Sequence, residues 1–570
     1  MRRSLLVLVL VAVSTIGWSP AGALASGASG AAPSSPRVQA DFNGDGADDI
    51  AVGVPGESVG SIISAGAVNV LLGSSGGLSG AGGQLFHQDV AGIGSAAEEF
   101  DSFGAALAVG NFNGDDFDDL AVGVPGESVG TVEGAGAINV LFGTAGGLTG
   151  AGSQLFHQDV AGIGSAAELF DFFGSALAAG DLDGDGIDDL AVGVPFESVG
   201  TVEGAGAVNV LYGSPSKLNG GRASALFHQD VAGIGSSAQP FDQFGASLAI
   251  GDFDDSGVSD LAVGSPGEAV GSVQAAGAAH VLFGGTTGVS GASSQLFHQG
   301  VAGVGSDPEE GDFFGAALGV GDINGNGFAD LAIGAPGESV GAIPGAGAIN
   351  VLYGTVGGLT VTGSQVLHQG VAGIGSNPEA FDEFGFALIG GDFDNDGFVD
   401  VAVGVPFESV GAIPGAGAIN VLFGGGGGLA GVGSQLFHQD VAGVGSTAEA
   451  FDNFGWSLAA GDVQANGFAD LVVGVPFEAV GAVQGAGAIN VFSGAGAGLT
   501  GGAVLHQDVA GIGSSAEEFD VFGLAVAGPD PQGASAAAAS AAPAISDTSD
   551  TGAAATSAAA AGAAGRSLGR

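Results

Sequence analysis

The chain has 570 residues, of which 46% are hydrophobic and 116 are glycine, so it can bury a core and form many tight turns. Asp and Glu total 60 against 7 Lys and Arg, which gives a formal net charge of −53 at pH 7. A surface this acidic repels nucleic-acid phosphates and anionic lipid headgroups, which excludes nucleic acid as a partner. The chain has no cysteine, so it folds without disulfides.

The N-terminal segment has the three parts of a secretory signal peptide. Two arginines are followed by an apolar stretch over residues 5–13 and by Ala23-Leu24-Ala25. We expect residues 1–25 to be a signal peptide and residues 26–37 a linker. A retained membrane anchor is the alternative, but the apolar stretch is short for a membrane span. The expected location is therefore secreted or at the cell surface, with no membrane span after cleavage.

An acidic loop recurs seven times at a period of 70 or 71 residues. Each repeat has the same order: Phe-Gly with an apolar run, the acidic loop, an apolar run ending in Gly-x-Pro, a Gly-Ala-rich run, a turn, and a run ending in His-Gln. Short apolar runs bounded by Gly and Pro are typical of buried strands. Four strands in each of seven repeats predict an all-β fold, a seven-bladed β-propeller over residues 38–530.

The third loop, from Asp181 to Asp189, has carboxylates at positions 1, 3, 5 and 9. These can converge on one point, position 7 can add a backbone carbonyl, and Gly186 can take the positive φ that wraps the loop around an ion. This oxygen cage predicts Ca²⁺ binding. The spacing also opens an EF-hand, but position 12 is Val192 and the flanking runs are strands, so a calcium-binding β-turn is predicted instead.

The other six loops follow the same scheme with fewer carboxylates in most of them. Loops with fewer charged oxygens bind Ca²⁺ more weakly, so we expect up to seven ions, with the weakest at the loops that begin at Asn111 and Asp462. Polar turns without an ion are the alternative. The predicted ligands are Asp41, Asn43, Asp45, Ala47, Asp49, Asn111, Asn113, Asp115, Phe117, Asp119, Asp181, Asp183, Asp185, Ile187, Asp189, Asp252, Asp254, Ser256, Val258, Asp260, Asp322, Asn324, Asn326, Phe328, Asp330, Asp392, Asp394, Asp396, Phe398, Asp400, Asp462, Asn466, Phe468 and Asp470.

The two ends of the repeat region complement each other. No Phe-Gly pair precedes the first loop, whereas Phe522-Gly523 follows the last complete repeat and has no loop of its own. We therefore expect the N- and C-terminal strands to share one blade and close the ring, which also removes exposed sheet edges. Residues 531–570 are rich in Ala, Ser and Gly and predict a disordered tail, with an Ala-rich helix as the alternative.

With its Phe-Gly pairs, acidic loops and Gly-x-Pro tripeptides, including Gly334-Ala335-Pro336, the chain resembles FG-GAP repeat proteins, the family of the integrin alpha-chain propeller. The resemblance covers about residues 38–528. It implies a seven-bladed propeller with Ca²⁺ in the blade loops, of a bacterial secreted type. The chain has no Arg-Gly-Asp and no inserted adhesion domain, so receptor signalling is not implied.

Two further residue types recur once per repeat. Seven histidines stand in His-Gln pairs, which predicts a structural role such as side-chain hydrogen bonds between blades. Seven glutamates follow the Gly-x-Pro prolines; solvated loop ends are the preferred interpretation, with a metal site or one propeller face as alternatives. The histidines are His87, His157, His228, His298, His368, His438 and His506, and the glutamates are Glu57, Glu127, Glu197, Glu268, Glu338, Glu408 and Glu478.

The sequence thus predicts a secreted, monomeric, calcium-binding module for adhesion or ligand binding, with no catalytic residues. The expected ligand is an extracellular protein or glycan, bound by the inter-blade loops around residues 56–60 and their repeats. An extracellular hydrolase or lyase acting on polysaccharide or lipid is the alternative, and a structural envelope protein is a second alternative.

Overall fold

The computed structural model describes residues 25–26, 40–528, 533–534 and 536–537, all within one compact unit, Gly17–Ala541. A second unit, made of Met1–Ile16 and Ala542–Arg570, lies outside the described residues. Most of the predicted signal peptide, linker and tail also lies outside them, so these three assignments stay predictions. The described residues contain no helix that is long and apolar enough to cross a membrane.

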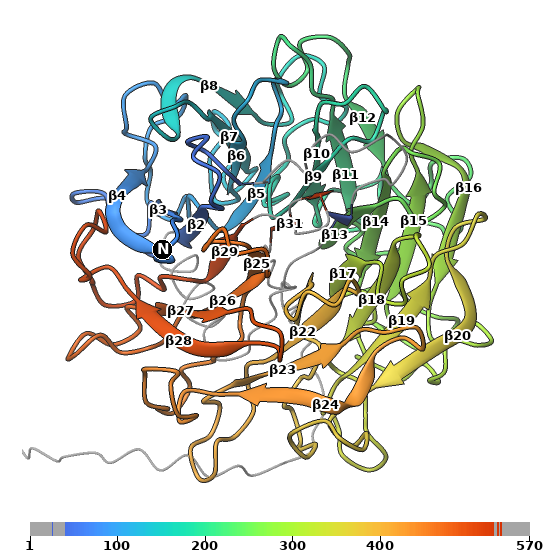
Figure 1. Cartoon of the computed structure of the whole chain (residues 1–570). Helices are drawn as coiled ribbons and strands as arrows, with labels where there is room; N and C mark the ends of the chain where they lie inside the picture. Colours follow the sequence, from blue (N-terminus) through green and yellow to red (C-terminus); the bar gives the residue numbers. More distant parts are fainter. Residues whose placement is uncertain (1–24, 27–39, 529–532, 535, 538–570) are drawn as a thin grey trace, which may run out of the picture. The chain divides into compact units, whose positions relative to one another are not determined.

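Seven antiparallel blades are arranged in a ring, which confirms the predicted all-β seven-bladed propeller (Figure 1). In the second blade the strands lie in sequence order: β5 (Ala106–Gly110), β6 (Asp119–Val124), β7 (Ala137–Phe142) and β8 (Thr149–Phe156). The first three are buried along their whole length, and the fourth is partly exposed because it forms the outer edge. Each first strand contacts the first strands of both neighbouring blades, so the core runs around the ring.

The third to seventh blades repeat this order. The third has β9 (Ala176–Gly180), β10 (Asp189–Val194), β11 (Ala207–Leu211) and β12 (Ala225–Phe227). The fourth has β13 (Ser247–Gly251), β14 (Asp260–Ser265), β15 (Ala278–Phe283) and β16 (Ser290–Phe297), and the fifth has β17 (Ala317–Gly321), β18 (Asp330–Ala335), β19 (Ala348–Tyr353) and β20 (Thr360–Leu367). The sixth has β21 (Ala387–Gly391), β22 (Asp400–Val405), β23 (Ala418–Phe423) and β24 (Ala430–Phe437), and the seventh has β25 (Leu458–Gly461), β26 (Asp470–Val475), β27 (Ala488–Ser493) and β28 (Thr500–Leu505).

The first blade takes its strands from both ends of the repeat region, as predicted. Its innermost strand is β29 (Ala525–Ala527), which pairs antiparallel with β2 (Ile50–Val54). The blade continues with β3 (Ala67–Leu72) and β4 (Ser79–Phe86). Because β29 also contacts β5 and β25, the ring is closed.

Three two-residue strands complete the described structure. They are β1 (Ala25–Ser26), which pairs with β13, β30 (Gly533–Ala534), which pairs with β1, and β31 (Ala536–Ala537), which pairs with β9.

The repeated glycines are explained by close contact between blades. Gly123 on β6 lies so near the Phe173-Gly174 pair of the next blade that a Cβ on Gly123 would meet the Gly174 carbonyl oxygen at 2.2 Å. Gly174 itself has a φ of 89°, which only glycine adopts without strain. Phe173 is fully buried beside it. The Gly-x-Pro motif of one blade and the Phe-Gly motif of the next blade therefore form the contact between the two blades.

Candidate metal sites in the acidic loops

Six of the seven acidic loops join the first and second strands of their blades, and the first loop directly precedes β2. The third loop lies between β9 and β10, and Asp189 at position 9 is the first residue of β10. Because neighbouring strands run in opposite directions, these loops share one face of the ring with the turns between the third and fourth strands. The hairpins between the second and third strands and the links between blades share the opposite face.

Hydrogen bonds from the backbone fix both ends of the loop. Asp181 at position 1 accepts bonds from Gly184 N at 2.6 Å and Gly186 N at 2.9 Å. Asp189 accepts bonds from Leu182 N at 3.0 Å and from Gly213 N, just beyond β11, at 2.8 Å. These bonds aim both carboxylates into the loop.

Three loops bring three carboxylates together, with one ligand atom from each residue and all three atoms within 4.8 Å of one another. In each cluster the residues come from positions 1, 3 and 9. Asp183 Oδ1 and Asp394 Oδ1, both at position 3, are buried and have no hydrogen-bond partner among the described residues. This donor set suits a hard divalent cation. The clusters are Asp181, Asp183 and Asp189; Asp252, Asp254 and Asp260; and Asp392, Asp394 and Asp400.

The clusters hold three carboxylates where the spacing predicted up to four. Asp185 at position 5 accepts a bond from Ile187 N at 3.0 Å, which closes the turn, and Asp396 does the same with Phe398 N. In the first loop, Asn43 at position 3 donates to Asp49 at 3.3 Å, so an amide stands where the clusters have a carboxylate. Ligation by position 5 and by the position 7 carbonyl stays a prediction.

Crowding of the carboxylates has an electrostatic effect. Burial, together with the charges of Asp183 and Asp181, raises the pKa of Asp189 to about 9. Burial and like charges also raise the pKa of Asp260 and of Asp400 to about 8. A cation at the cluster would offset this repulsion.

The seven loops are joined into a ring by backbone hydrogen bonds. The position 8 N–H of one loop donates to the position 1 carbonyl of the preceding loop, as Ser259 N does to Asp181 O at 3.0 Å. The bond from Asp48 N to Asp462 O, at 3.3 Å, joins the first loop to the last. Asp48 and Asp118 at position 8 also accept bonds from position 1 N–H groups, a role that sequence reasoning missed although the Asp-Asp doublets are visible.

The interpretation of the repeated glutamates as solvated loop ends is wrong, and the glutamines rather than the histidines tie neighbouring blades. Gln88 Nε2 donates to Glu127 Oε2 of the next blade at 2.5 Å, whereas His87 Nδ1 is buried without a partner among the described residues. The same pair recurs at every junction, including Gln507 with Glu57 at 2.6 Å, where the ring closes.

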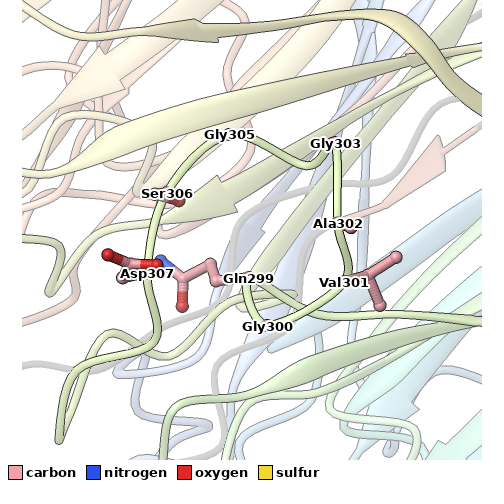
Figure 2. Close-up of a pocket in the computed structure, with 8 residues that line it drawn as sticks. All are labelled: Gln299, Gly300, Val301, Ala302, Gly303, Gly305, Ser306 and Asp307. Carbon is pink, nitrogen blue, oxygen red and sulfur yellow. The ribbon is translucent and has the colours of Figure 1, made fainter.

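A shallow pocket of about 320 Å³ lies in the link between the fourth and fifth blades (Figure 2). Residues 299–303 and 305–307 line it. Asp307 is the one titratable side chain among the described residues that line the pocket. The pocket therefore lacks an acid–base pair.

The fold and the sites define a class of protein, a seven-bladed propeller in which three blades have a carboxylate cluster between their first two strands. The FG-GAP repeat family matches residues 38–71, 103–141, 173–211, 314–352, 384–422 and 454–492, so the chain contains six FG-GAP repeats. The fourth blade lies outside these matches, yet it has the same four strands.

The chain is similar to parts of larger proteins. It is 32% identical to integrin alpha-5 of Xenopus laevis over 248 residues, which is 42% of this chain and 20% of the relative. It is also 32% identical to phosphatidylinositol-glycan-specific phospholipase D of Rattus norvegicus over 180 residues, 32% of this chain and 20% of the relative. The chain thus spans about a fifth of the length of these relatives.

One solved structure that matches is the exotype rhamnogalacturonan lyase YesX. The TM-score is 0.36 at 12% identity, and the match covers 83% of this chain and 80% of that chain. No functional argument follows from this likeness.

Proposed function

We propose that the chain is an extracellular, calcium-stabilised β-propeller that binds a protein or glycan ligand on the face opposite the acidic loops. The signal-peptide pattern and the similarity to integrin alpha chains support an extracellular location. The three carboxylate clusters support calcium as the ion, since carboxylate oxygens at this spacing suit it.

The proposal for ligand binding is supported by phenylalanines that recur in the links between blades with a strained backbone. Six of the seven links between blades hold a phenylalanine with φ between 64° and 70°. This left-handed conformation is costly for a bulky residue and persists where the surroundings enforce it. In the remaining link Gly311 stands at the same position. The six residues are Phe100, Phe170, Phe241, Phe381, Phe451 and Phe519.

The adjacent hairpins hold the backbone of these phenylalanines in place. Phe381 N donates to Pro344 O at 3.0 Å, and Phe451 N donates to Pro414 O at 3.0 Å. The residues Phe381, Phe451 and Phe519 are 62–63% exposed. Exposed aromatic rings on a rigid support are typical of binding surfaces, because they bury a large area at low entropic cost. Hairpins such as the one at Gly267, whose N–H donates to Asp242 O, pack against these links.

An array of glycans and of extracellular-matrix and cell-wall components, probed with calcium present, tests this function. We expect saturable binding that the double variant Phe381→Ser, Phe451→Ser weakens strongly. Val432→Ser is the control, because Val432 is an apolar residue, 80% exposed, on the outer strand β24 and is not one of the six phenylalanines. Absence of saturable binding contradicts the proposal, and turnover of a polysaccharide or lipid by the purified protein favours the hydrolase or lyase alternative.

A further inference from the structure

Positive charge is concentrated in one loop of the described structure. Of the 7 Lys and Arg residues, only Lys217 and Arg222 lie among the described residues. Both belong to the connection between β11 and β12 in the third blade. This connection is long because β12 has only 3 residues, whereas the fourth strands of the second, fourth, fifth and sixth blades have 8. The connection lies on the face of the acidic loops.

Arg222 reaches the candidate metal site of its own blade. Its Nη1 lies 3.2 Å from Asp183 Oδ2, and its guanidinium carbon lies 4.1 Å from the centroid of the Tyr212 ring. The Asp183 side chain is 13% exposed and that of Arg222 is 36% exposed. Asp183 belongs to the cluster with Asp181 and Asp189. A fixed positive charge therefore contacts a ligand in the loop with the most carboxylates.

The two other clusters have no such cation among the described residues. Their position 3 carboxylates, Asp254 and Asp394, make no ion pair within the described structure. Lys217 does not reach the carboxylate cluster of the third loop either. Its Nζ donates to Gly152 O at 2.6 Å and lies 3.5 Å from the Phe142 ring centroid, on the side of the second blade.

We infer that Arg222 competes with the metal ion at the third loop and weakens calcium binding there. This inference rests on the proposed calcium binding. A cation entering the cluster meets the guanidinium charge and must share Asp183 or displace Arg222. Coupling is reciprocal, so calcium also weakens the hold of the third loop on Arg222. The third loop, which the carboxylate count ranks with the strongest, is thereby made weaker than the sixth.

Terbium luminescence can isolate the third site, because the chain has two tyrosines and one lies at this loop. In a Tyr353→Phe background, Tyr212 is the single tyrosine that can sensitise bound Tb³⁺. The second, fourth and sixth blades already have phenylalanine at the equivalent of Tyr353. Calcium added to the Tb³⁺-loaded protein displaces the probe and reports the affinity. A Tyr212→Phe variant identifies the part of the emission that comes from the third loop.

We expect Arg222→Gln to raise the calcium affinity of this site by about fivefold or more, the lower end of typical couplings between sites. Lys217→Gln makes the same change of charge in the same connection and should leave the affinity unchanged. Arg222→Lys keeps the charge and should keep the affinity low. Equal affinities in Arg222→Gln and Lys217→Gln overturn the inference. Absence of Tyr212-sensitised emission in every variant also overturns it; calorimetry then separates the outcomes, because calcium bound elsewhere leaves the proposed function standing.

Discussion

At the residue scale, one hydrogen bond shows how donor and acceptor change together across the repeats. In five links an aspartate accepts a bond from the backbone N–H eight residues later, as Asp440 does from Ala448 at 3.1 Å. In the other two links Gly300 and Gly370 replace the aspartate. There the donor position is Pro308 or Pro378, and proline has no N–H. Where proline removes the N–H donor, glycine has therefore also replaced the aspartate, so every aspartate at this position keeps its hydrogen-bond partner.

This pairing predicts that the aspartate matters only where its donor exists. Asp440→Gly should destabilise the protein by about 1 kcal/mol, because it leaves the N–H of buried Ala448 unpaired. Gly300→Asp should bring no gain, because Pro308 offers no donor. Thermal unfolding of the two variants and the parent, in the same calcium buffer, measures both effects. If Gly300→Asp raised the thermal midpoint by as much as Asp440→Gly lowers it, the pairing would be contradicted.

The carboxylate at position 3 of the sixth loop leads to a second prediction, in which the change in stability depends on calcium. Asp394→Ala removes a cluster ligand and should lower the thermal midpoint in calcium, since a filled site adds about 2.7 kcal/mol when free Ca²⁺ is a hundredfold above its dissociation constant. In a chelator the same change should be neutral or stabilising, because it removes a charge from a crowded site.

Gln464→Ala at position 3 of the last loop is the matched control for this comparison. Gln464 is neutral and donates to Ser493, so its removal should have a smaller effect that is the same with and without calcium. An Asp394→Ala loss that persists unchanged in the chelator would show that the carboxylate acts without a metal ion.

At the element scale, the strands and the acidic loops could be predicted from sequence, but the contacts between blades could not. Apolar runs bounded by Gly and Pro located β9 and β10, because burial and turn chemistry are local properties. The bond from Gln158 to Glu197 joins residues 39 apart in different blades, and no local pattern marks it. His157 and Gln158 follow the end of β8 and lie in the link between blades, so the dipeptide did not reveal that the glutamine contacts the next blade.

The buried glutamates at the junctions predict a pH dependence. Burial, and then the charges of Asp171 and Glu168, raise the pKa of Glu197 from its ordinary value of 4.5 to about 8. Folded protein therefore keeps a proton that unfolded protein releases above pH 4.5. The stabilisation is complete below the unfolded pKa and is lost as the pH rises through the folded pKa of about 8.

The thermal midpoint of calcium-saturated protein should thus fall as the pH rises from about 5 to about 8. Glu197→Gln should make this slope shallower, since glutamine does not titrate and can still accept the bond from Gln158. Glu203→Gln, in the hairpin of the same blade, serves as the control for a lost negative charge. A parent slope identical to that of Glu197→Gln would mean that Glu197 is ionised in the folded protein.

At the scale of the whole molecule, the ring closes with the same bonds that join its interior blades. β29 pairs with β2, Asp48 N donates to Asp462 O, and Gln507 donates to Glu57. Each bond has counterparts at the other junctions, such as Ser259 N with Asp181 O. The shared first blade therefore joins residues more than 400 positions apart. The bonds between acidic loops and the Gln–Glu bonds between blades each continue around the whole ring.

This closure predicts that β29 holds the ring together. A chain ending at Asp520 lacks Phe522 and Val526, both fully buried, and each large apolar side chain contributes about 1.5–3 kcal/mol on burial. It also leaves β2 as an unpaired edge strand, which favours association between molecules. We expect a lower thermal midpoint and higher-mass species in light scattering, whereas a chain ending at Gly528, which keeps β29, should melt close to the parent.

A synthetic peptide of residues 521–528 should restore part of the midpoint of the shorter chain by pairing with β2. If the chain ending at Asp520 stays monomeric and melts with the one ending at Gly528, the first blade does not need its C-terminal strand.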